Sequence, residues 1–327
     1  MTGPPRLRTP WTGRGPRGIL VLGMHRSGTS AATRLVNAMG PALCDPGDMV
    51  RGPWNPSGHW ESRSLMHLND NLLRQMGRTW WYPPPAGESY PPLPGDTYAA
   101  VADAVTTRPA QARRAFRRVH HGVPWVWKDP RTSVLVPFWR AALGPRLAAV
   151  VVFRNPLDVA VSLGRRHGVS VSFGVALWER YNRLLLTHAA GLPVLVTRYD
   201  DLVADPAGWS QSTKEFLAGV GTKLRGSVDS ALSAGFVDPG LRHSAHTRGQ
   251  IAEGAEVPPG ALALYDALEA VSGPSAAFVP PVLGPEPVSV EAELATVGPE
   301  RKLDWRPPPW AVPGDGAPSE ERGVGGG

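Results

Sequence analysis

The sequence predicts a three-layer α/β fold in which helices flank a central parallel sheet. Residues 19–22 are uninterruptedly apolar, and residues 147–153 form a second apolar run that is rich in valine. Strands that helices cover on both faces have such continuous runs, whereas half-exposed strands alternate between apolar and polar residues. Helical periodicity follows each run, and residues 173–190 form a further, clearly amphipathic helix.

A glycine-bearing loop follows the first strand. Residues 23–30 read Gly-Met-His-Arg-Ser-Gly-Thr-Ser, and residues 31–39 form a predicted helix that ends at Gly40. A strand, a tight loop and a helix N-terminus direct several backbone N–H groups at one point, which suits a phosphate. Nucleotide triphosphatases have a lysine after the second glycine, but here the residue is Thr29. The loop therefore indicates a P-loop-type fold that binds an anion other than the end of ATP, with Arg26 as the nearest cation.

Two basic side chains stand at the ends of later strands. Residues 123–128 alternate as a short strand that ends at Lys128, and the apolar run of residues 147–153 ends at Arg154. The carboxyl ends of parallel strands meet at the ligand-binding edge of an open sheet, so both side chains are expected to face the loop. Asn155 can cap the next helix, on which Ser162 lies about two turns further. The alternatives are an Arg154 that pairs with a carboxylate and a Lys128 that snorkels at the surface.

The candidate general base comes from the segment Asn55-Pro56-Ser57-Gly58-His59-Trp60-Glu61, a turn that leads into an amphipathic stretch. Near Arg26 and Lys128 the Glu61 carboxylate would stay ionised and could accept a hydroxyl proton. Glu61 could instead be a carboxylate that serves the dipole of the next helix. His59 is a rival base.

These segments together resemble the sulfotransferases that use 3′-phosphoadenosine-5′-phosphosulfate (PAPS). The loop has the Arg-Ser-Gly-Thr form of the bacterial, carbohydrate and tyrosylprotein members. Three further segments follow in the order of that family: a Lys-Asp-Pro segment, an Arg at a strand end with a Ser on the next helix, and a Tyr-Asp-Asp-Leu segment. In this chain they lie at residues 127–130, 150–162 and 199–206.

The resemblance implies a role for each matched residue. The catalytic residues would be Lys128, which stabilises the leaving group, Glu61, which takes the acceptor proton, and Arg26. The donor would be held by Arg26, Ser27, Gly28, Thr29 and Ser30 at its 5′-phosphosulfate, by Arg154 and Ser162 at its 3′-phosphate, and by Tyr199 at its adenine. A late 3′-phosphate contact in the family is open here between Arg242 and Arg248.

The expected reaction moves a sulfuryl group from PAPS to a hydroxyl of a glycan or natural-product acceptor and leaves 3′,5′-adenosine bisphosphate. A tyrosine acceptor is also compatible. The alternatives are a P-loop kinase that uses ATP and a non-catalytic nucleotide- or glycan-binding protein of the same fold. The missing loop lysine argues against the first, and the presence of Lys128 and Arg26 argues against the second. No metal is expected, because fixed cations would take its place.

Composition limits the remaining choices. The 327 residues carry a net charge of +6, which fits an anionic ligand, but no nucleic-acid-binding motif accompanies it. Cys44 is the single cysteine, so an internal disulfide is excluded. No signal peptide or membrane span is evident, which favours a cytoplasmic protein, and the excess of Ala, Gly, Pro and Arg suggests a bacterial genome. A basic helix face, either solvated or a contact for an acidic acceptor, is expected at Arg113, Arg114, Arg117 and Arg118.

The chain is expected to divide into three parts. Residues 1–17 form a flexible N-terminal arm, residues 18–272 the sulfotransferase-like domain, and residues 273–327 a poorly ordered tail rich in proline and glycine. A proline-rich insertion at residues 80–97 is either a wall or lid over the acceptor cleft or a connector between two helices. The oligomeric state is not indicated.

Overall fold

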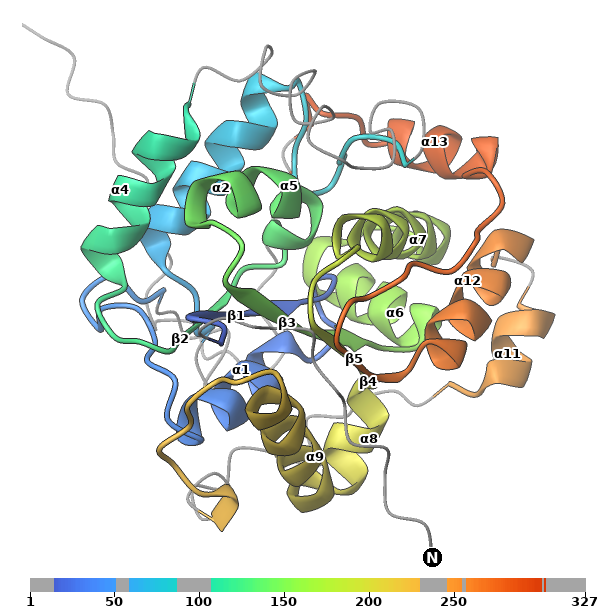
Figure 1. Cartoon of the computed structure of the whole chain (residues 1–327). Coiled ribbons are helices and arrows are strands. Elements are labelled where there is room, and N and C mark those ends of the chain that lie inside the picture. Colours follow the sequence, from blue (N-terminus) through green and yellow to red (C-terminus); the bar gives the residue numbers. More distant parts are fainter. Residues whose placement is uncertain are drawn as a thin grey trace, which may run out of the picture.

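A computed structural model describes residues 15–50, 59–86, 107–229, 246–254, 257–301 and 303 (Figure 1). Most of the predicted N-terminal arm, the beginning of the segment before Glu61, and Arg242 lie outside these residues. The described residues form a five-stranded sheet with the order β2-β1-β3-β4-β5. The strands are β1 (Gly18–Leu22), β2 (Trp125–Lys128), β3 (Leu147–Phe153), β4 (Val194–Arg198) and β5 (Gly273–Ser275).

The predicted parallel sheet is confirmed. Strand β1 pairs in parallel with both β2 and β3, and β3 pairs in parallel with β4. Only β5, which pairs with β4, runs antiparallel. Every residue of β1, β2 and β3 is buried, as the continuous apolar runs indicate.

Helices cover both faces of this sheet and produce two separate apolar cores. One core packs the Ile19, Val150 and Val152 face of the sheet against α1 and α9. The other packs the opposite face, with Leu20 and Val151, against the remaining large helices. None of the described helices combines the length and apolarity that a bilayer crossing requires. The helices are α1 (Thr29–Ala38), α2 (Arg63–Gln75), α4 (Pro109–Val119), α5 (Thr132–Leu143), α6 (Pro156–His167), α7 (Val171–His188), α8 (Tyr199–Ala204), α9 (Pro206–Gly219), α11 (Arg248–Glu253), α12 (Pro259–Ala270) and α13 (Val288–Ala295).

The C-terminal segment differs from its expected disorder. Residues 273–275 form β5 at the sheet edge, and α13 packs against α7 (Figure 1). The segment buries the Phe278, Val290 and Leu294 side chains in the apolar core. It also supplies carboxylates to a charge that the sequence pattern did not reveal: the Arg180 guanidinium of α7 is wholly buried and pairs with Glu286, and with Glu291 at 2.6 Å. A buried arginine needs such carboxylates, so the segment is held in place. The predicted boundary at residue 272 therefore lies within the packed unit, and residues 304–327 lie outside the described residues.

The first part of the proline-rich insertion is packed in the same region. We call residues 79–86 the strap. The Trp81 indole donates to the Gly298 carbonyl at 3.0 Å, and the Ala86 N–H donates to Glu286 at 2.8 Å. The Tyr181 hydroxyl of α7 donates to the Trp80 carbonyl at 2.8 Å. The strap is thus fixed by α7 and by the segment around α13, and residues 87–97 lie outside the described residues.

Candidate active site

The glycine loop connects β1 to α1 and is held by α5. The Gly23 N–H donates to the Ser133 hydroxyl at 2.9 Å, and that hydroxyl lies 3.2 Å from the Gly23 carbonyl. Gly28 caps α1 with a φ of 89°, and a Cβ added there would lie 2.0 Å from the Tyr199 ring. Glycine is therefore required at this position. No side chain caps α1, so the N–H groups of its first turn are available to an anion.

The predicted 3′-phosphate residues lie beside this loop. Arg26 donates from its Nε to the Ser162 hydroxyl of α6 at 2.9 Å. The Arg154 guanidinium lies 5.0 Å from the centre of the Tyr199 ring, so the predicted phosphate and adenine contacts are neighbours. The structure thus brings Arg26, Arg154, Ser162 and Tyr199 to one edge of the sheet.

Arg154 also pairs with a carboxylate, which was the alternative for this residue. Its Nε lies 3.4 Å from Asp158 of α6, which is almost fully buried. The other Asp158 oxygen accepts from the backbone N–H of His246 at 3.1 Å and lies 2.6 Å from the Nδ1 atom of the His246 ring. Asp158 therefore divides its two oxygens between Arg154 and His246. It orients the Arg154 guanidinium, but its negative charge is not devoted to Arg154 alone. The Trp178 indole further fixes the Arg154 carbonyl at 3.0 Å.

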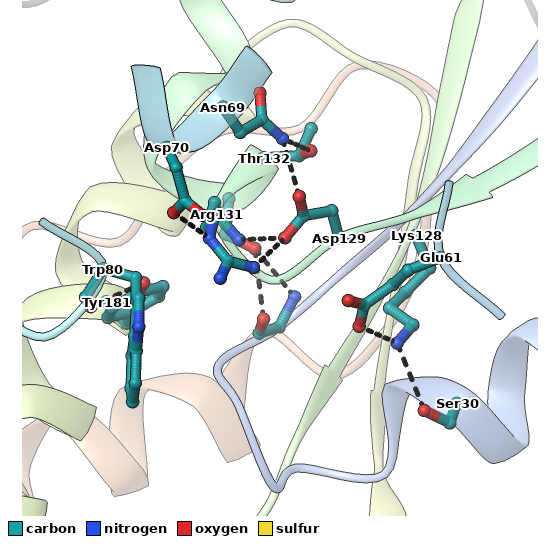
Figure 2. Close-up of polar contacts among 12 residues, drawn as sticks. Ser30, Glu61, Asn69, Asp70, Trp80, Lys128, Asp129, Arg131, Thr132 and Tyr181 are labelled. Atoms are coloured by element: carbon teal, nitrogen blue, oxygen red, sulfur yellow. Dashed lines mark hydrogen bonds and ion pairs between the residues drawn. The ribbon is translucent and has the colours of Figure 1, made fainter. Parts of the chain in front are cut away.

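The carboxyl end of β2 carries the second half of the site. Lys128 is 2% exposed, so the snorkelling alternative is wrong. Its ammonium contacts the Glu61 carboxylate and donates to the Ser30 hydroxyl of α1 at 3.2 Å (Figure 2). This contact joins the strand end, the helix N-terminus and the segment before α2. Lys128 and Glu61 therefore form a buried ion pair directly beside the loop.

Glu61 is not part of a helix. Ser62 is the N-cap of α2 and accepts from the Leu65 N–H at 3.2 Å, so Glu61 precedes the first turn, which contains no acidic residue. The Glu61 carbonyl accepts from the Val50 N–H at 2.8 Å, which fixes its backbone. Trp60, the residue before it, has a φ of 59°, a backbone conformation that residues other than glycine rarely adopt. The segment is therefore shaped to direct Glu61 inward, and the helix-dipole alternative is wrong.

A second buried network positions this pair. Arg131 donates to Asp70 of α2 at 2.5 Å and to Asp129 at 3.1 Å (Figure 2). The other Asp129 oxygen accepts from Asn69 at 2.9 Å, and Asn69 in turn accepts from the Trp139 indole at 2.8 Å. Burial raises the pKa of Asp129, while the charge of Arg131 opposes that rise. The network ties α2 to the segment just after β2, and so fixes the spacing of Glu61 and Lys128.

The rival base His59 lies at the same site. The Ser30 hydroxyl lies 3.4 Å from the His59 carbonyl. Burial, and then the charge of Lys128, lower the pKa of His59 to about 3. An imidazole with so low a pKa is a weak proton acceptor at neutral pH. The choice of Glu61 over His59 as the base stays a prediction.

Sequence reasoning did not single out Arg166. It follows Ser162 by one helical turn on α6, and this i,i+4 spacing is the signal that could have identified it. Burial, and then the charge of Arg26, lower the pKa of Arg166 to about 10, whereas Glu61 raises it. Arg166 is therefore a further cation whose charge acts on both Arg26 of the loop and the Glu61 carboxylate.

Aromatic rings also pack against the loop, and we call the Trp80, His25, His167 and Tyr181 rings the aromatic wall. The Trp80 ring of the strap lies 4.5 Å from the His25 ring of the loop and 5.2 Å from the His167 ring of α6. Tyr181 lies 5.8 Å from His25. Burial, and then the charge of Arg131, lower the pKa of His25 well below its ordinary value. The first part of the insertion therefore lies beside the loop, and its role as a wall or lid over the acceptor cleft stays a prediction.

The structure does not support Arg248 as the late contact to the 3′-phosphate. Its guanidinium makes a bidentate pair with Asp266 at 2.6 Å for both contacts, and Arg242 lies outside the described residues. Across the described ranges, no three histidine, cysteine or carboxylate side chains gather as metal ligands would.

The chain belongs to the sulfotransferase family. The family model described as "Sulfotransferase family" matches residues 16–218, which is more than half of the chain and includes the loop, Lys128 and Arg154. This match confirms the resemblance that the loop and the later segments indicated.

Two solved structures are also similar. One is the sulfotransferase domain from the Synechococcus PCC 7002 olefin synthase, at 16% identity and a TM-score of 0.35, covering 87% of this chain and 96% of that domain. The other is the sulfotransferase domain from the curacin biosynthetic pathway, at 12% identity and a TM-score of 0.38, covering 89% and 100%. No curated protein matches the chain.

Proposed function

We propose that this sulfotransferase moves the sulfuryl group of PAPS to a hydroxyl group of a glycan or natural-product acceptor. The observation that carries the proposal is the buried Lys128–Glu61 pair, which contacts Ser30 at the start of α1. A cation and a proton acceptor are thus fixed within one hydrogen bond of the helix N-terminus that would bind the anion. Sulfuryl transfer to a hydroxyl needs these three parts together.

The donor would lie along the carboxyl edge of the sheet. The uncapped N–H groups of α1 and the Arg26 side chain would bind its 5′-phosphosulfate. Arg154 and Ser162 would bind the 3′-phosphate, because a guanidinium can make two parallel bonds to phosphate. Tyr199 would pack on the adenine, next to the Arg154 guanidinium. The donor supplies an activated sulfuryl group.

The protein residues would act on both ends of the transfer. Glu61 takes the proton of the acceptor hydroxyl as that oxygen bonds to sulfur. Lys128 donates to the phosphate oxygen that gains negative charge as the old sulfur–oxygen bond breaks. The acceptor thus gains the sulfuryl group, and the phosphate leaves with the electron pair of that bond. Arg26 and Arg166 would add fixed positive charge near the transferred group. Positioning and electrostatics would therefore carry most of the catalysis.

The acceptor would bind against the aromatic wall. Trp80 is half-buried and is held between His25 and His167. A partly exposed indole beside the loop can stack on a sugar or an aromatic ring. This position favours a ring-bearing acceptor.

Calorimetric titration of 3′,5′-adenosine bisphosphate, 5′-AMP and ATP tests the donor assignment. We expect the bisphosphate to bind about tenfold or more tightly than 5′-AMP, because Arg154 and Ser162 would bind its 3′-phosphate. Arg154→Lys keeps the charge but loses the two-pronged geometry, so it should remove most of this preference. Arg248→Ala is the matched control, because that arginine already pairs with Asp266, and it should bind like the wild type.

Transfer itself is tested with sulfur-labelled PAPS and a panel of oligosaccharides, phenols and tyrosine peptides. Lys128→Met should lose turnover and retain bisphosphate binding. A preference for ATP, or equal binding of 5′-AMP and the bisphosphate, would refute the PAPS proposal and favour the kinase.

A further inference from the structure

A second cavity lies at the opposite edge of the sheet. It has a volume of about 350 Å³ and is bounded by the segment before β1, by the start of β2 and β3, and by α4. The glycine loop follows the carboxyl end of β1, whereas this cavity is at the amino ends. The two are separated by the length of a strand, about 15 Å for five residues. We call it the basic cavity.

Four arginines line the basic cavity, and no carboxylate does. They are Arg17, Arg113, Arg117 and Arg146. Arg146 is held in place because its guanidinium donates to the Gly15 carbonyl at 3.0 and 2.6 Å. Across the described ranges, no carboxylate forms an ion pair with Arg17, Arg113 or Arg117. Like charges gathered around one hollow repel each other, and an anion that enters it relieves this repulsion.

Aromatic rings form the inner side of the same cavity. The Phe116 and His120 rings stack at 4.4 Å with an angle of 9°, and the Trp125 ring lies 4.6 Å from Phe116. Within the described part of the chain, neither nitrogen of the buried His120 ring has a hydrogen-bond partner. Burial lowers the pKa of His120 to about 3, so the ring is neutral and adds no charge. The cavity therefore combines a cationic rim with an uncharged aromatic floor.

We propose that the basic cavity binds a small ligand that joins a planar ring to a phosphate or sulfate ester. The guanidinium groups match the charge and geometry of such an ester, and the aromatic floor matches the ring. The volume falls in the range of small-molecule pockets, and the site is hollow rather than a flat basic strip. The α4 arginines thus divide into two pairs: Arg113 and Arg117 line the cavity, while Arg114 and Arg118 do not.

This division supplies a matched pair of variants for the test. Phenyl phosphate and phenyl sulfate are titrated calorimetrically into the full chain, with benzyl alcohol as the uncharged control. A saturating concentration of 3′,5′-adenosine bisphosphate is present to occupy the loop site. We expect at least one of the two esters to bind the wild type. The Arg113→Gln/Arg117→Gln variant should bind that ester about 10- to 100-fold more weakly. The Arg114→Gln/Arg118→Gln variant has the same net charge and should bind within about twofold of the wild type.

The outcomes separate the proposal from its alternatives. If both double variants weaken binding equally, the effect is one of overall charge and the proposal is wrong. If neither ester binds the wild type, it is also wrong. If benzyl alcohol binds as well as the esters, the arginines have no role in recognition. All four arginines of α4 are exposed, so thermal unfolding should be nearly unchanged in both variants. The bisphosphate titration alone reports on the donor site, so a failure there is distinguishable from a failure here.

Discussion

The replacement Arg131→Met tests whether the buried network positions the catalytic pair. Methionine keeps most of the side-chain volume but removes the donors to Asp70 and Asp129. Asp129 is 1% exposed, so it would remain as a buried carboxylate without its guanidinium. Breaking one side of a buried ion pair costs about 3–5 kcal/mol. The Asp70 contact is partly exposed and adds little, about 1 kcal/mol or less.

Urea unfolding at pH 7.5, followed by fluorescence and circular dichroism, measures this loss. The double variant Arg131→Met/Asp129→Asn removes the orphaned charge and should regain about 2 kcal/mol or more. The loss should also shrink at pH 5.5. Burial already raises the pKa of Asp129, and removal of Arg131 raises it further. A carboxyl with a raised folded pKa destabilises most above that pKa, and protonation relieves the cost as the pH falls.

Two results would refute the reasoning about this network. One is a loss below about 1 kcal/mol in the single variant, which would mean that water solvates Asp129. The other is a double variant no more stable than the single one, which would mean that the charge is not the cause. Turnover should fall in the single variant with little change in bisphosphate affinity, because the network sets the position of Lys128 and not the loop.

Three further predictions concern other parts of the fold. Arg180→Met should lower the free energy of unfolding by about 3–5 kcal/mol in urea, because Glu286 stays buried; an unchanged value would contradict the role of this arginine in holding the C-terminal segment. Gly28→Ala should weaken bisphosphate binding by about tenfold or more in calorimetry, since its φ is 89° and the Tyr199 ring blocks a Cβ; wild-type affinity would disprove it. Because burial lowers the pKa of His120 to about 3, folding excludes a proton that the unfolded side chain binds below about pH 6.5. Above pH 6.5 both states leave His120 neutral, so the group does not lower the free energy of unfolding. By pH 5 the unfolded state binds a proton that the folded state excludes, and the free energy of unfolding should be lower by about 2 kcal/mol. His120→Phe should flatten the pH dependence in urea titrations by that amount, and an unchanged slope would count against the assignment.

Much of the site could be predicted from local sequence. The glycine loop, Lys128 and Arg154 each follow a strand whose apolar run is short and continuous. Since parallel strands point their carboxyl ends at one edge, the strand pattern alone places these three together. The family match over residues 16–218 includes all three positions.

Other parts of the site could not be predicted in this way. Arg131 pairs with Asp70, 61 residues away, and no local pattern links them. Arg166 shares a helix face with Ser162, but its direction toward the loop depends on how α6 lies across the sheet. The Arg248–Asp266 pair likewise depends on how α11 packs against α12.

The C-terminal segment illustrates the limit most clearly. Its proline and glycine content predicts disorder, and locally nothing contradicts that prediction. The segment is held by tertiary contacts: Phe278, Val290 and Leu294 enter the apolar core. The buried Arg180 of α7 also pairs with Glu286 and Glu291, more than 100 residues later in the chain. By itself, then, the sequence determined the strands, the loop and the family, because local periodicity records burial and chain direction. Only the tertiary structure decided which buried charges meet, because a desolvated charge selects its partner by position in space and not by distance along the chain.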